Sequence, residues 1–105
     1  MKKFQSLLLM TFLIVCSASA SNFYVSSTAN GNGDGSKANP WKLQQALNSP
    51  ASISNPTDTV WVWMEGGVYT NAFDNQTSFN CFTKGNPNAP IIFRNYNNER
   101  VTIDG

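Results

Sequence analysis

The chain has 105 residues, of which 41% are hydrophobic and 12% charged, with a formal net charge of +1 and no histidine. So small a charge provides no basic field for capturing nucleic acid, and the lack of histidine argues against the usual zinc ligand sets. Many Asn, Ser, Thr and Gly residues, with aromatic residues among them, are typical of a turn-rich β protein rather than a helical bundle.

The first twenty residues have the features of a secretory signal peptide. Lys2 and Lys3 form a positive segment, residues 7–15 are an apolar run, and residues 18–20 (ASA) are a small-residue cleavage site. The run is shorter than the roughly 20 apolar residues of a membrane span. We therefore expect residues 1–20 to be removed after Ala20, and the remaining chain to be secreted or periplasmic and not attached to a membrane.

Removal of the signal peptide would change the charge and the cysteine content. It would leave five basic and six acidic side chains, a net charge of −1. It would also remove Cys16, so that Cys81 could form no intramolecular disulfide. Because Cys81 stands in a segment flanked by phenylalanines, we expect it to be a small buried hydrophobic residue.

Short elements follow the signal peptide in chain order. Residues 22–26 are expected to form a strand, and residues 28–38 (TANGNGDGSKA) a loop of residues that tolerate left-handed backbone conformations. A helix is expected over residues 39–48, with Asn39 as N-cap, Pro40 at the first helical position and an apolar stripe that begins at Trp41. Further strands are expected at residues 58–64, 68–70, 78–83, 90–96 and 101–103. Short strands separated by Gly, Asn and Pro turns indicate a sandwich, a barrel or a solenoid.

Several segments, taken in order, carry a family resemblance. They are residues 23–28 (FYVSST), 39–47 (NPWKLQQAL), 58–62 (DTVWV), 66–70 (GGVYT), 88–96 (NAPIIFRNY) and 100–105 (RVTIDG). This order resembles the N-terminal entry of right-handed parallel β-helix proteins of the pectate lyase-like superfamily. Secreted bacterial pectate lyases and the chondroitinase B and alginate lyase group are the members it resembles most.

The resemblance implies an all-β solenoid. In this interpretation residues 21–105 hold an N-terminal cap helix and the first coils of a right-handed parallel β-helix, and further coils would follow Gly105. A cap helix suits such a fold, because the terminal repeat of a solenoid must cover its exposed core. Arrays of this kind usually need three or more repeats, so we expect residues 21–105 alone to be of marginal stability.

The resemblance also implies a function. The leading hypothesis is a polysaccharide lyase that cleaves uronic-acid polymers by β-elimination, with calcium and a basic residue on later coils. No residue of this chain matches the catalytic motifs of the family, so no catalytic residue and no metal ligand is assigned to it. A glycoside hydrolase on the same scaffold and a non-catalytic surface or adhesion module are the alternatives.

Trp61 and Trp63 are the candidate substrate-binding residues. Alternation along a strand places both on one face, where two aromatic rings form a stacking platform for a sugar. The sequence favours the opposing hypothesis, that the strand is buried on both faces, because long apolar runs usually are.

Other groups of residues give weaker indications. Residues 30–35 (NGNGDG) have the donor spacing that opens a calcium loop, but Trp41 stands where the bidentate acid should be, which favours a solvated turn. Glu65 and Asp74 could form a glycosidase pair, although nothing in the sequence fixes their separation. The basic residues that a lyase could use are Lys84, Arg94 and Arg100, which are more simply surface charges.

Overall fold

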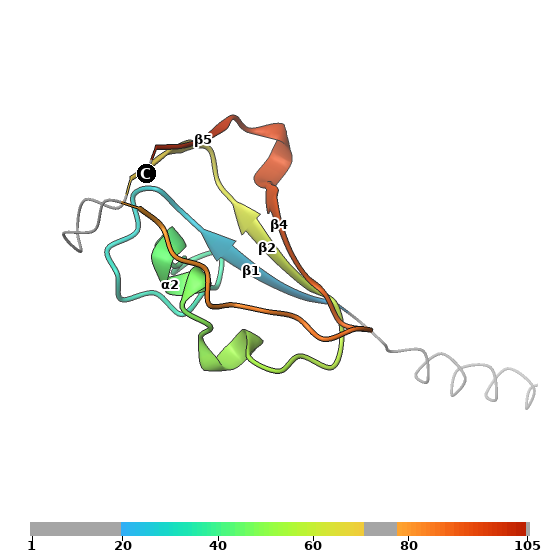
Figure 1. Cartoon of the computed structure of the whole chain (residues 1–105). Coiled ribbons are helices and arrows are strands. Elements are labelled where there is room, and N and C mark those ends of the chain that lie inside the picture. The colour runs from blue at the N-terminus through green and yellow to red at the C-terminus, as the bar shows by residue number, and fades with distance from the viewer. Residues whose placement is uncertain (1–19, 71–77, 105) are drawn as a thin grey trace, which may run out of the picture.

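The computed structural model describes residues 20–70 and 78–104, so the expected signal peptide lies, up to residue 19, outside the described residues. The described part is an all-β structure with few and short helices (Figure 1). Its strands are β1 (Ser21–Val25), β2 (Val60–Met64), β3 (Gly67–Tyr69), β4 (Ile91–Asn95) and β5 (Val101–Ile103). Its helices are α2 (Leu43–Leu47) and the 3₁₀ turns Ala51–Ile53 and Tyr96–Asn98. Within these described ranges no helix has the length and apolar character needed to cross a membrane.

All the strand pairs are parallel. β1, β2 and β4 form one sheet in that order, and β3 pairs with β5 in a second sheet. Val60 at the start of β2 pairs with Ser21 of β1 on one side and with Ile91 of β4 on the other. The following residues of the three strands pair in the same register. Figure 1 shows the three strands side by side and pointing the same way. Because β2 leads into β3 and β4 leads into β5, the stretches 60–69 and 91–103 run alongside each other.

The core lies under one face of the larger sheet. The inward side chains of β2 are Val60, Val62 and Met64, all buried. The other fully or largely buried hydrophobic residues of the cluster are Val25, Trp41, Leu43, Ala46, Ile53 and Tyr69. Burial of a single Val or Ile side chain contributes about 1.5–3 kcal/mol, so this layer supplies much of the stability of so small a structure.

Tyr69 fixes the corner between the two sheets. Its ring is buried and its hydroxyl donates to the carbonyl oxygens of Val25, at 3.0 Å, and of Glu65, at 2.5 Å. Gly67, at the start of β3, has a φ of 140°, and a Cβ at this position would collide with the Oγ of Ser27. The corner therefore depends on one buried hydroxyl and on one residue without a side chain.

The free edge of β1 is covered by the chain itself. Tyr24 N–H donates to Gly35 O at 2.7 Å, and Trp41 N–H donates to Tyr24 O at 3.0 Å. Val25 and Trp41 form a parallel β-bridge, and the ring of Trp41 stacks on that of Phe23 with centroids 5.1 Å apart. We call residues 35–41 the edge segment. It satisfies backbone groups that would otherwise be open to another strand.

The helix is shorter than the sequence predicts. It begins at Leu43 rather than after Asn39, because the backbone of Trp41 is extended and bonded to β1. Lys42 is the N-cap residue, and its N–H donates to Gln45 Oε1 at 2.8 Å, which is one half of a capping box. The prediction that Asn39 caps the helix and Pro40 opens it is wrong. The prediction of an apolar helical side is confirmed in part, since Leu43 and Ala46 are buried.

Residues 78–83 are not a strand, in contrast to the prediction. This segment pairs with the end of α2: Phe82 N–H donates to Leu47 O at 2.7 Å, and Thr83 Oγ1 donates to Ala46 O at 2.5 Å. The carbonyls at the end of a helix lack internal partners, and these two contacts supply them. Cys81 is exposed, which overturns the expectation of burial, and Phe82 is 65% exposed.

A pair of asparagines joins the turns before β2 and β4. Asn86 Nδ2 donates to Asn55 Oδ1 at 3.1 Å and to Pro56 O at 2.7 Å. Both turns contain the dipeptide Asn-Pro, and the same offset separates Asn55 from Asn86 as Val60 from Ile91. The sequence therefore holds a short repeat in register with the strand pairing.

Candidate functional site

The outward face of the larger sheet carries two rows of side chains. Register aligns Asn22, Trp61 and Ile92 in one row. It aligns Tyr24, Trp63 and Arg94 in the next. Since alternate residues of a strand point to the same face, these side chains stand opposite the core layer. We call Tyr24, Trp61, Trp63 and the nearby Tyr96 the aromatic face.

β2 is fully buried on one side only. Val60, Val62 and Met64 are buried, whereas Trp61 and Trp63 are half-buried. The strand is therefore not fully buried on both faces, as that hypothesis requires: its outward side chains are half-buried, and the two indoles stack on each other. Their rings are nearly parallel, at 11°, with centroids 5.3 Å apart. Each ring thus shields one face of the other, and in the described residues no second aromatic ring stacks on Trp61.

The orientation of Trp63 is fixed by a hydrogen bond across the strands. Its Nε1–H donates to Asn22 Oδ1 at 2.9 Å. This contact satisfies the polar edge of an indole whose remaining atoms pack on aromatic neighbours. The amide nitrogen of Asn22 stays at the surface as a hydrogen-bond donor, because Asn22 is exposed.

Tyr96 closes one end of the aromatic face. It follows β4 directly, in the 3₁₀ turn Tyr96–Asn98, where Asn97 has a positive φ of 54°. Its ring is nearly perpendicular to Tyr24, at 76° and 5.7 Å, and to Trp63, at 75° and 6.4 Å. A pocket of about 370 Å³ opens here, lined by Asn22, Tyr24, Trp63, Tyr96 and Asn97.

A lysine from the edge segment reaches the same two tyrosines. Lys37 Nζ lies 4.6 Å from the centroid of Tyr96 and 5.6 Å from that of Tyr24. Such cation–π contacts contribute about 0.5–1 kcal/mol at exposed sites. Lys37 therefore links the edge segment to the aromatic face.

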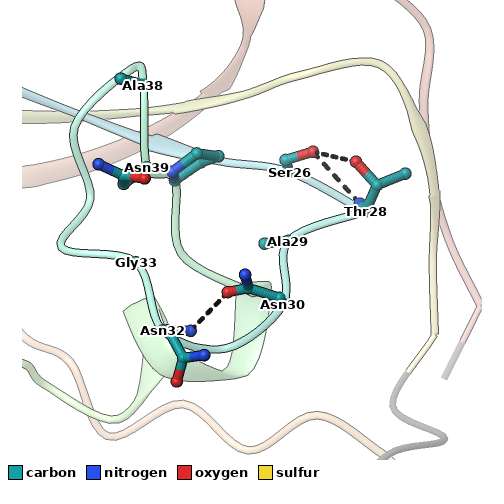
Figure 2. A pocket seen from close by; sticks show the side chains of 9 residues that line it. Ser26, Thr28, Ala29, Asn30, Asn32, Gly33, Ala38 and Asn39 are labelled. Carbon is teal, nitrogen blue, oxygen red and sulfur yellow. Dashed lines mark hydrogen bonds between the residues drawn. The ribbon is translucent and has the colours of Figure 1, made fainter.

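The glycine-rich loop is a network of turns. Asn30 Oδ1 accepts from Asn32 N at 2.8 Å, and Ser26 Oγ accepts from Thr28 N at 3.2 Å (Figure 2). Asp34 Oδ1 accepts from Ser36 N at 3.0 Å, and hydrogen bonding with Ser36 lowers the pKa of Asp34 below its ordinary value. The oxygens of Asn30 and Asp34 thus serve the loop itself, which agrees with the solvated turn that the sequence favours.

Among the described residues, the other candidates do not gather into one site. Asp74 lies outside the described residues, so its pairing with Glu65 is not described. Arg94 stands on the outward row beside Trp63, whereas Arg100 accepts from Gly67 through its backbone carbonyl at 3.0 Å. Lys84 is exposed in the connection before β4. In residues 20–70 and 78–104, no three His, Cys, Asp or Glu side chains gather as a metal site.

Sequence reasoning selected Trp61 and Trp63 but missed Tyr24 and Tyr96. The alternation of β1 contains the signal for Tyr24, because Asn22 and Tyr24 share one face of the strand. No local pattern indicates that Tyr96 turns back over the sheet. No protein family model, curated protein or solved structure matches the chain. The aromatic face is therefore the feature from which a function is inferred.

Proposed function

We propose that the chain belongs to an exported parallel β-helix protein that binds a polysaccharide on the aromatic face. The in-register parallel pairing of β1, β2 and β4 supports the solenoid part of this proposal, as does the matching pair β3 and β5. In a solenoid each coil contributes one strand to each sheet, which is the relation between residues 60–69 and 91–103.

The observation that carries the binding proposal is the outward pair Trp61 and Trp63. Sugar rings expose flat patches of C–H groups, and these pack on the faces of aromatic rings, while their hydroxyls bond to nearby amides. Trp61 is half-buried, and Trp63 covers one face of its ring, which leaves the other face for a sugar in this proposal. Asn22 supplies an amide beside both indoles. A rigid sheet holds these groups in place, so little conformational entropy is lost on binding.

The sugar in this proposal is acidic. Arg94 follows Trp63 in the same row of the sheet, and its exposed guanidinium can form a bidentate pair with a carboxylate. A uronic acid that stacks on the indoles would present its carboxylate toward such a group. For a uronic-acid polymer the corresponding reaction is β-elimination, in which a base removes the proton beside the carboxylate. Its catalytic groups, and the calcium that would acidify this proton, are not assigned to any described residue.

The test is binding of the secreted chain to a panel of polysaccharides. Polygalacturonate, alginate and chondroitin sulfate should retard the chain in affinity electrophoresis more than a neutral glucan does. Trp61→Ala should reduce this retardation about tenfold, because it removes the free ring face. Phe82→Ala is the matched control, since Phe82 is an exposed aromatic residue outside the aromatic face.

The outcomes separate the candidate functions. Equal retardation of wild type and Trp61→Ala by every polymer would contradict the binding proposal. Binding accompanied by unsaturated product, measured by ultraviolet absorbance with and without a chelator, would support the lyase. Binding without any product would favour a non-catalytic module, and a saturated reducing end would favour a hydrolase.

A further inference from the structure

The pocket beside Trp63 is lined by aromatic and amide side chains. Its five lining residues are Asn22, Tyr24, Trp63, Tyr96 and Asn97, none of which carries a formal charge. Three of the five are aromatic, and the other two are amides. Such a lining recognises a ligand by its shape and by the quadrupoles of the rings rather than by ion pairing.

The rings form walls rather than a platform. Tyr96 is nearly perpendicular to both Tyr24 and Trp63, and Trp61 covers one face of Trp63. The rings of this pocket stand at steep angles to one another, whereas Trp61 and Trp63 are nearly parallel. A compact, rounded group can touch two or three rings at once. A ligand of this shape that also carries a positive charge gains from every ring face it touches.

Lys37 shows that these rings accept an ammonium group. Its Nζ lies 4.6 Å from the centroid of Tyr96 and 5.6 Å from that of Tyr24, although Lys37 does not line the pocket. The lysine is exposed and belongs to the edge segment, so it can swing into solvent without disturbing the core. Its charge would compete with that of a second cation on the same two rings.

We propose that this pocket binds an organic ammonium group and that Lys37 is its built-in competitor. The chemistry is that of a compact alkylated ammonium, such as the trimethylammonium of choline, or of the protonated amine of an amino sugar. The pocket shares part of the aromatic face with the polysaccharide proposal but does not include Trp61, so Trp61 distinguishes the two sites.

The experiment titrates the secreted chain with choline chloride at constant ionic strength, with tryptophan fluorescence and proton NMR as readouts. The control ligand is the uncharged analogue of choline in which the quaternary nitrogen is a carbon atom. Choline should bind at least about tenfold more tightly than this analogue, since only choline gains from the ring quadrupoles. Protonated glucosamine in a parallel titration distinguishes the two sources of the ammonium.

Variants identify the walls and the competitor. Tyr96→Leu should weaken choline binding about tenfold, whereas Tyr96→Phe keeps the ring and should retain it. Lys37→Met should strengthen binding about threefold or more, because it removes the resident charge. Trp61→Ala should reduce polysaccharide binding about tenfold and choline binding much less, because Trp61 does not line the pocket, so the two proposals can fail separately.

Three results would overturn the inference. Equal binding of choline and its neutral analogue would reduce the site to an ordinary apolar pocket. Unchanged affinity in Tyr96→Leu, with the fold retained by circular dichroism, would place the ligand elsewhere. Weaker rather than stronger binding in Lys37→Met would make Lys37 a part of the site instead of its competitor.

Discussion

The two faces of the larger sheet differ in what their side chains do, although the same strands supply both. On β2 the inward Val60, Val62 and Met64 are buried in the core, and the outward Trp61 and Trp63 are half-buried and stacked. A shift of one residue along the strand therefore separates a side chain that stabilises the fold from one available to a ligand. Stability and binding should accordingly respond to different substitutions at adjacent positions.

The largest expected effect comes from a charge placed on the inward face. Val62→Asp puts an unpaired carboxylate at a position with 0% exposure, and should lower the free energy of unfolding by about 3–5 kcal/mol. Trp61→Asp, one residue away, should cost less, about 1–2 kcal/mol, through lost ring stacking and partial burial. Urea denaturation followed by far-ultraviolet circular dichroism measures both. Similar losses for the two variants would refute the division between the faces.

On the core side, the buried hydroxyl of Tyr69 stabilises the fold through hydrogen bonds. Tyr69→Phe removes the hydroxyl donor from the carbonyls of Glu65 and Val25, of which the latter keeps its bond from Glu65 N–H, at a cost of about 1–3 kcal/mol. Burial, with smaller contributions from the carboxylates of Glu65 and Glu99, raises the pKa of Tyr69 well above its ordinary value of 10.0. Only the neutral hydroxyl donates, so its stabilisation is fully present below about pH 10 and is lost as the pH rises further.

The pH dependence of stability tests this contribution of the buried Tyr69 hydroxyl. Above about pH 10, where free tyrosine titrates, the wild type should lose stability and Tyr69→Phe should lose less. Thermal melts at a series of pH values measure the difference. Parallel pH curves for the two proteins would show that the Tyr69 hydroxyl contributes no pH-dependent stability.

The smallest expected effect lies in the turns, which belong to neither face. Asn86→Ala removes two hydrogen bonds that join the turns before β2 and β4, and should cost about 1–2 kcal/mol. Asn88→Ala is the control, because Asn88 is an exposed residue of the same turn. Thermal melts of the two variants should differ by a few degrees. Identical melts would mean that the asparagine pair follows the strand register without helping to hold it.

The sequence predicted the elements whose signal is local. β2 and β5 occur where expected, because short runs of β-branched and aromatic residues bounded by turn residues are typical of strands. The outward position of Trp61 and Trp63 follows from simple alternation. The parallel order of the strands could not be read from composition or from spacing, since it depends on pairings across long intervals of chain.

The errors come from contacts between distant segments. The helix begins late because the backbone of Trp41 bonds to β1, which no local pattern around Asn39 indicates. Residues 78–83 have the composition of a strand, but their hydrogen bonds go to the end of α2. Tyr96 joins the aromatic face through a turn with a left-handed residue at Asn97. The Asn-Pro repeat is the one such contact that the printed sequence could have revealed.

The edge segment leaves only one side of the larger sheet open to a further strand among the described residues. Residues 35–41 occupy the open side of β1, so a new strand cannot add there without displacing hydrogen bonds already made. In the described part of the chain no strand pairs with the opposite side of β4. The sheet can therefore gain a strand beside β4. Stacking of β1 on the β4 of another copy, as in a fibre, would require the edge segment to be displaced.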